Sequence, residues 1–177
     1  MAISRVHRQW NGDSLQDAYS VRSDPSDGMW LMRGGERVLP LSDVSGERIA
    51  DLLTRFRRGL LENSDINCHG VTQYVLGKPG EPCWINEDAP RGDSLTVRDA
   101  IRTLELPCAV QLIDARAGGC VALVHSAVVL GQTSNEDPLV FHKPGDQAPE
   151  FCALDESMRW FDTEFPSLSF FGAKRTR

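Results

Sequence analysis

Residues 121–130 read VALVHSAVVL, and this stretch decides the fold class. It is apolar except for His125 and Ser126, which is typical of a strand inside a sheet. On one side of it, residues 108–113 (CAVQLI) predict another strand, which ends at Asp114 before a turn at Gly118-Gly119. On the other side, residues 139–142 (LVFH) predict a third, which Lys143-Pro144-Gly145 ends. With a last strand at residues 168–171, the second half of the chain predicts an antiparallel sheet.

The first half of the chain is mainly helical by the same reasoning. Residues 45–62 carry one apolar stripe at helical spacing, and a second helix starts near Cys68 and ends at Gly77. A short helix is expected over residues 94–104. Before them, residues 29–32 and 37–41 flank Gly34-Gly35 and predict a hairpin. Helices that precede a sheet indicate an α+β fold.

Length and composition suit one soluble domain. The 177 residues are 41% hydrophobic and 25% charged, and the net charge of −6 lacks the basic face of a nucleic-acid binder. We divide the domain into an N-terminal extension with a hairpin (1–44), a core (45–145) and a C-terminal segment (146–177), and expect the extension to form one groove wall or to cap the site. No apolar run is long enough to span a membrane, and no signal peptide is visible. We therefore expect a protein that is cytoplasmic as synthesised, or an effector exported without a cleavable signal.

The five cysteines predict reduced thiols. Their number is odd and no CxxC pair occurs, which disfavours a zinc ribbon or a disulfide framework. A zinc site built from Cys68, His69 and Cys83 would need a fourth ligand at an unremarkable spacing. No cofactor and no metal are expected.

Cys68 is the candidate nucleophile. It stands where a helix begins, and free backbone N–H groups and the helix dipole there favour a thiolate and offer half of an oxyanion hole. His125, a titratable group in an apolar strand, is the candidate base. A hairpin at the loop 131–138 can place His142 beside His125, where it would orient the ring. The plainer interpretations are that Cys68 is a buried thiol, His125 a core histidine and His142 an exposed strand end. His69 is expected either at the surface or packed behind the catalytic residues.

These segments resemble the NlpC-type papain-like cysteine peptidases and amidases. NCHG at residues 67–70 is similar to the Asp-Cys-Ser-Gly motif that opens their nucleophile helix, with Asn and His replacing Asp and Ser. HSAVVLG at residues 125–131 resembles the strand of their base, and residues 139–142 resemble the strand of their third catalytic residue. The resemblance covers about residues 49–145. It implies a papain-like fold with Cys68 as nucleophile, His125 as base and His142 as orienting residue.

The resemblance also implies a thiol hydrolase. Such enzymes cleave amide or isopeptide bonds through a thioester, often in peptidoglycan peptides. A peptide or peptidoglycan-like substrate is therefore expected, and an inhibitor or immunity protein is a conceivable partner. Two alternatives stay open: a deamidase or acyltransferase of the same fold, and a non-catalytic papain-like binding module. A circularly permuted lipid acyltransferase would need the earlier His7 as its base and is less favoured.

Overall fold

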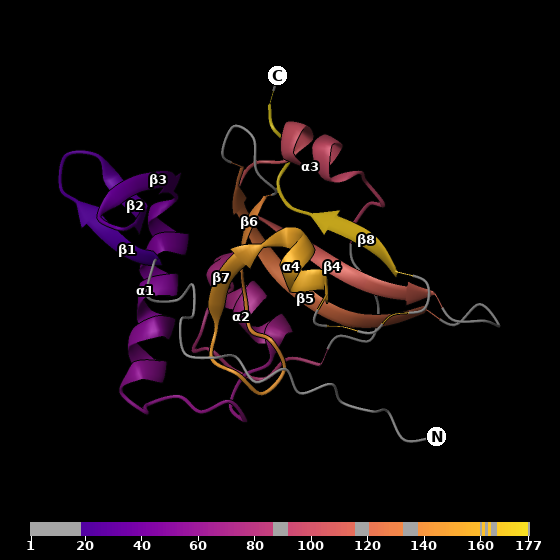
Figure 1. Cartoon of the computed structure of the whole chain (residues 1–177), viewed down its shortest axis with the longest axis horizontal. Coiled ribbons are helices and arrows are strands. Elements are labelled where there is room, and N and C mark those ends of the chain that lie inside the picture. Colours follow the sequence, from indigo (N-terminus) through magenta and orange to yellow (C-terminus); the bar gives the residue numbers. More distant parts are fainter. Residues whose placement is uncertain are drawn as a thin grey trace.

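The apolar run at residues 121–130 forms the middle of a five-stranded antiparallel sheet in a computed structural model of the chain (Figure 1). The structure describes residues 19–86, 92–115, 121–132, 138–159, 161, 163 and 166–176. The strand order is β7-β6-β5-β4-β8. The strands are β4 (Cys108–Ala115), β5 (Val121–Gly131), β6 (Leu139–His142), β7 (Glu150–Ala153) and β8 (Pro166–Phe171). The predicted α+β class and the antiparallel sheet are confirmed, and β7 is an addition to the prediction.

The N-terminal part forms a separate three-stranded sheet. It consists of β1 (Tyr19–Asp24), β2 (Gly28–Arg33) and β3 (Glu36–Leu41). The predicted hairpin at Gly34-Gly35 is confirmed, because both glycines have the positive φ, 58° and 88°, that its tight turn requires. Strand β1 is an addition to the prediction.

The described residues include four helices beside the sheets: α1 (Asp43–Arg57), α2 (Cys68–Val75), α3 (Val97–Thr103) and α4 (Leu154–Arg159). Helix α1 was expected to reach residue 62, but it ends five residues earlier. Gly59 adopts a left-handed φ of 65° directly after the cap residue Arg58, and this conformation stops the helix. Leu60, expected in the apolar stripe, is 69% exposed as a result. Helix α4 is an addition to the prediction.

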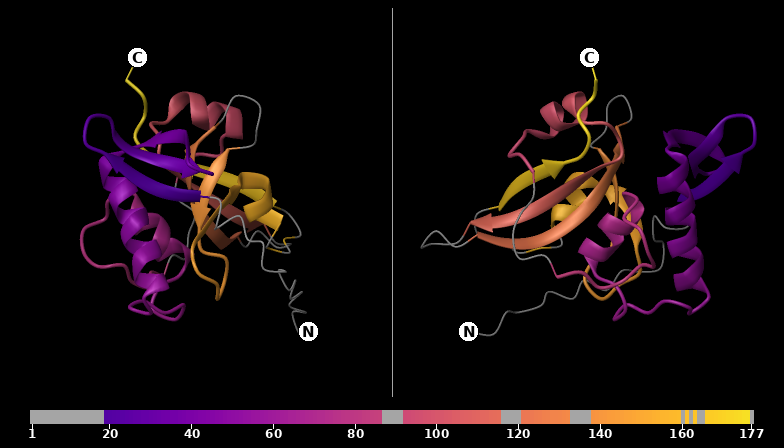
Figure 2. Two further views of the ribbon diagram at one scale, coloured as in Figure 1. Left: turned by 60° about the vertical axis from the view of Figure 1, so that its left-hand side comes forward. Right: turned by 180° about the vertical axis from the view of Figure 1, so that it is seen from behind.

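The five-stranded sheet separates two apolar clusters. One contains side chains of α1 and α2 together with Val128 of β5 and Phe141 of β6. The other contains side chains of α3 and α4 together with Ala127 of β5 and Val140 of β6. Figures 1 and 2 show the corresponding arrangement, in which α2 lies between α1 and the sheet. Helix α2 therefore rests on the face of β5 that bears even-numbered residues.

Candidate functional site

Cys68 is the first residue of α2, as predicted. Its neighbour Asn67 is the N-cap, whose side-chain oxygen accepts hydrogen bonds from the backbone N–H groups of Gly70 (2.9 Å) and Ile85 (3.2 Å). The side-chain amide of Asn67 also donates to the carbonyl oxygen of Ile85 (2.7 Å). An aspartate cannot donate this last bond, so the structure gives a physical reason for Asn in place of the Asp of the resembling motif.

The Cys68 thiol is partly buried among polar groups. The backbone N–H groups of Ser126 and His69 and the hydroxyl of Ser126 donate hydrogen bonds to its sulfur, and the positive charge of Lys143 lies nearby. Burial nevertheless raises the pKa of the Cys68 thiol, because it outweighs these interactions, each of which acts in the opposite direction. The thiol is accordingly protonated in the resting protein, and the net direction of the pKa shift is opposite to the lowering that was expected from the helix terminus.

His69 and Lys143 are buried neighbours of this thiol. The Nδ1 atom of His69 lies 2.8 Å from Oγ of Ser126, and the His69 side chain is only 8% exposed, which contradicts the surface reading. Lys143, at 1% exposure, donates from Nζ to the carbonyl oxygen of Gly145 (2.5 Å). Burial lowers the pKa of Lys143, whereas the Cys68 and Asp146 charges act to raise it.

His125 and His142 are brought together as predicted. Nε2 of His125 lies 3.0 Å from Nδ1 of His142, and the two rings meet nearly edge-on at 84°. Both rings are fully buried, and that of His125 stacks on Phe161 with 4.3 Å between the ring centroids. Nδ1 of His125 has no hydrogen-bond partner. Burial, followed by the nearby His142 and His69, lowers the pKa of His125 well below its usual value, so its imidazole is neutral.

The predicted direct pair of Cys68 and His125 is not formed in this structure. Side chains alternate along a strand, so Ser126 projects toward α2 while His125 projects to the opposite face together with Ala127. The thiol bonds to the N–H of the peptide group that joins His125 to Ser126. Ser126 therefore occupies the position next to the sulfur in which the sequence analysis placed His125.

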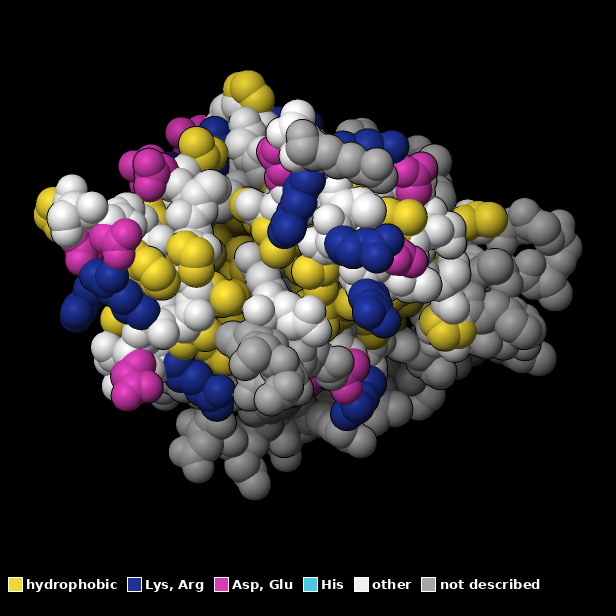
Figure 3. All heavy atoms as spheres, turned by 90° about the horizontal axis from the view of Figure 1, so that it is seen from above, with side chains coloured by type: hydrophobic (Ala, Val, Ile, Leu, Met, Phe, Trp, Pro, Cys, Tyr) yellow, Lys and Arg dark blue, Asp and Glu magenta, His cyan; other side chains and the backbone are white. Residues whose placement is uncertain are grey.

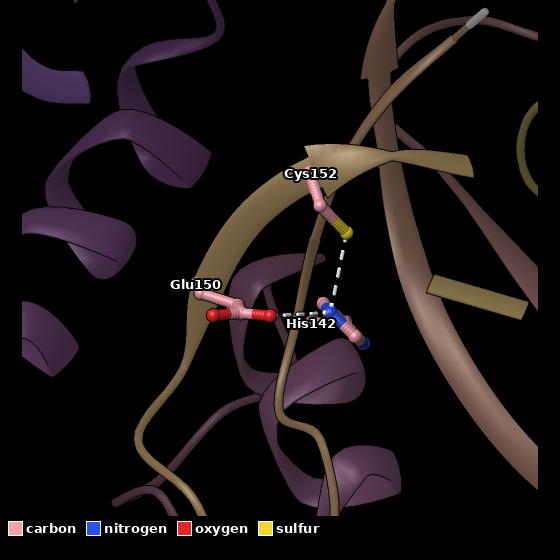
Figure 4. A group of neighbouring side chains, drawn as sticks. All are labelled: His142, Glu150 and Cys152. Carbon is pink, nitrogen blue, oxygen red and sulfur yellow. Dashed lines mark hydrogen bonds and ion pairs between the residues drawn. The ribbon is translucent and has the colours of Figure 1, made fainter. Parts of the chain in front are cut away.

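Two further polar side chains contact His142 on the sheet face away from α2. Glu150 and Cys152 come from β7 and both point toward its ring (Figure 4). Nε2 of His142 is 3.4 Å from Oε1 of Glu150 and 3.3 Å from Sγ of Cys152. These three residues are the ones in the described part of the chain whose ligand atoms gather closely enough to hold a metal ion.

Four residues of these clusters were not predicted from the sequence: Ser126, Lys143, Glu150 and Cys152. Ser126 and Lys143 directly follow the two predicted histidines, so strand alternation could have placed them on the opposite face, toward α2. Glu150 and Cys152 lie in a four-residue strand, which is too short to show a periodic pattern.

None of the described histidines lies at the surface. No histidine side chain is visible on the face drawn in Figure 3, where hydrophobic and charged side chains alternate instead. A shallow depression does open beside α2, at Gly70, Tyr74, Lys78, Pro79, Glu81, Cys83 and Ile85. Its lining includes Gly70, two residues after Cys68, but not Cys68 itself.

Comparisons with known proteins give no relative. No protein-family model matches the sequence, and neither curated proteins nor solved structures include one that is significantly similar to it. None of the helices in the described part of the chain is long and apolar enough to cross a membrane.

Proposed function

We propose that the protein is a papain-like cysteine hydrolase in which the Cys68 thiol attacks the carbonyl carbon of an amide or isopeptide bond. The observation that supports the proposal is the unpartnered Nδ1 of His125, a neutral and buried base in the residue before Ser126, whose backbone N–H bonds to the thiol. The His125 ring itself lies on the sheet face away from α2 in this structure. His142 holds the other nitrogen of that ring at 3.0 Å, which is the geometry of an oriented base.

The first step transfers one proton. Because His125 projects to the sheet face away from α2 in the resting structure, this step requires β5 to turn at His125 so that Nδ1 faces the thiol. Nδ1 then takes the S–H proton while the sulfur bonds to the substrate carbon. The carbonyl oxygen gains the negative charge, and the backbone N–H groups of Ser126 and His69, which now bond to the sulfur, are available to it. The leaving amine then takes the proton from His125, and a thioester remains on Cys68.

The second step returns the enzyme to its resting state. Water loses a proton to His125 and attacks the thioester carbon, and the released thiolate recovers that proton. Because the thiol and the imidazole are both neutral at rest, the mechanism requires proton transfer during attack rather than a preformed ion pair. Peptides of the bacterial cell wall are the substrate class that the sequence resemblance favours.

Acylation by an activated ester tests the nucleophile without knowledge of the substrate. The full-length protein is treated with p-nitrophenyl acetate, and peptide mass spectrometry locates the acetyl group. We expect acetylation at Cys68 and its loss in Cys68→Ala, whereas Cys83→Ala, which removes an exposed thiol, retains it. Acetylation of Cys83 alone, or equal labelling of all thiols, would favour the non-catalytic binding module.

The two predicted histidines are separated by their effects on rate. His125→Ala removes the base and should slow acetylation by about 10²–10⁴-fold. His142→Ala leaves the His125 base in place and only frees the His125 ring to rotate, so it should slow acetylation less than His125→Ala does. The reverse order would show that His142 is the base.

A further inference from the structure

We propose that His142, Glu150 and Cys152 bind a zinc ion on the sheet face opposite Cys68. The three ligand atoms are Nε2, Oε1 and Sγ, an imidazole, a carboxylate and a thiol that all suit Zn²⁺. The site shares His142 with the proposed triad, but none of its ligands contacts the Cys68 thiol, so it can be tested in a protein that lacks Cys68.

The distances from His142 to its two neighbours are compatible with zinc coordination as well as with weak hydrogen bonds. Charge-assisted bonds between an imidazole and a carboxylate are typically about 2.7–2.9 Å long, whereas Nε2 and Oε1 are 3.4 Å apart here. In a tetrahedral site with zinc–nitrogen and zinc–oxygen distances of about 2.1 Å, the two ligand atoms lie about 3.4 Å apart. A zinc–sulfur distance of about 2.3 Å likewise puts nitrogen and sulfur about 3.5 Å apart, close to the 3.3 Å between His142 and Cys152.

The backbone holds these ligands rigidly. His142 lies directly opposite Glu150, and Cys152 lies opposite Val140, in the antiparallel pairing of β6 with β7. Opposed and alternate residues share one face, so all three side chains converge without a loop having to move (Figure 4). The His142 and Cys152 side chains are buried, whereas that of Glu150 is 13% exposed, so the carboxylate marks the side from which an ion enters.

A hydrogen bond to His125 fixes the His142 ring. A zinc ion on Nε2 of His142 requires the ring proton on Nδ1, which then donates to Nε2 of His125 at 3.0 Å. Ligating histidines commonly donate their second N–H in this way, which fixes the orientation of the ring. The neutral His125 ring then carries its own proton on Nδ1, so the zinc-bound form cannot use that atom as the base of the proposed hydrolase. Binding of the ion also displaces the thiol proton of Cys152 to solvent, and the thiolate becomes the third protein ligand. The fourth position is left to water, as in zinc sites with three protein ligands.

Cobalt(II) titration of the full-length protein tests the site. A Cys68→Ala/Cys83→Ser background removes two thiols that are not fully buried, and makes the outcome independent of the proposed nucleophile. We expect one equivalent of Co²⁺ to produce a sulfur-to-cobalt charge-transfer band and the visible bands of tetrahedral coordination, both of which Zn²⁺ abolishes. Absence of the charge-transfer band would overturn the proposal.

Three variants in the same background identify the ligands. Cys152→Ser should lose the charge-transfer band, while Cys108→Ser, which changes another buried thiol of the same apolar cluster, should keep it. Glu150→Gln alters the most exposed ligand and should keep the band but weaken Co²⁺ binding at least tenfold. A band that survives Cys152→Ser, or unchanged affinity in a folded Glu150→Gln, would contradict the site.

Discussion

Replacement of Asn67 by alanine tests how the start of α2 is held. The side chain makes three hydrogen bonds: its oxygen accepts from Gly70 and Ile85, and its amide donates to Ile85. Loss of the cap bond costs about 1 kcal/mol. Each of the two bonds to Ile85 is partly exposed, so we count about 0.5 kcal/mol for each, at the low end of the usual range. Asn67→Ala should therefore lower the free energy of unfolding by about 2 kcal/mol.

Urea unfolding followed by circular dichroism measures this change, and two variants serve as controls. Asn67→Asp keeps the acceptor and adds a favourable negative charge at the helix N-terminus, so it should cost less than half as much. Thr96→Ala removes the N-cap of α3, where Oγ1 accepts the N–H of Asp99 and donates to the exposed Asp99 carboxylate, and should cost about 1 kcal/mol. If Asn67→Ala cost no more than Thr96→Ala, the bridge to Ile85 would contribute nothing and the reasoning would be refuted.

Three further predictions concern packing and titration around α2. A Cβ at Gly70 would lie 2.0 Å from the carbonyl oxygen of Cys83. Gly70→Ala should therefore destabilise the protein by about 1–3 kcal/mol or more, which thermal unfolding measures. An unchanged unfolding midpoint would show that the loop carrying Cys83 can move away. Burial and the hydrogen bond to Asp51 raise the pKa of Tyr74 to about 12. Tyr74→Phe should therefore remove the highest-pH step of the ultraviolet tyrosine titration, and Asp51→Asn should move that step to lower pH. An unshifted step in Asp51→Asn would mean that the carboxylate has no influence on the pKa of Tyr74. Because burial raises the pKa of Cys68, less of this thiol is ionised at pH 7. Iodoacetamide should therefore alkylate Cys68 more slowly than the exposed Cys83, and the difference between the two rates should narrow as the pH rises. Faster alkylation of Cys68 than of Cys83 at pH 7 would show a preformed thiolate.

The sequence was sufficient for the elements that have strong local signals. The Gly34-Gly35 hairpin, the start of α2 at Cys68 and the strands around the run at 121–130 follow from turn chemistry, capping and apolar patterning. The hairpin register also placed His125 beside His142. In contrast, β7 and α4, with four and six residues, are too short to show a periodic pattern, and β1 (YSVRSD) carries only two apolar side chains.

The face of β5 was the decisive uncertainty. Because β5 is apolar on both faces, its sequence shows no alternation of polar and apolar residues that would tell which of them contact α2. A shift of one residue in the assumed orientation exchanges His125 for Ser126 on the face toward α2. The pKa of Cys68 was predicted in the wrong direction for a related reason. The helix terminus can be read from the sequence, whereas the burial that outweighs it depends on elements far along the chain.

The identity of the base is the most direct test of the proposed function. We would measure the rate of Cys68 acetylation by p-nitrophenyl acetate in the wild type, in His125→Ala and in His69→Ala. The proposed mechanism predicts a loss of about 10²-fold or more for His125→Ala and a much smaller loss for His69→Ala, whose ring reaches the thiol only through the Ser126 hydroxyl. A full rate in His125→Ala together with a large loss in His69→Ala would contradict it, and would assign the proton transfer to Ser126 and His69.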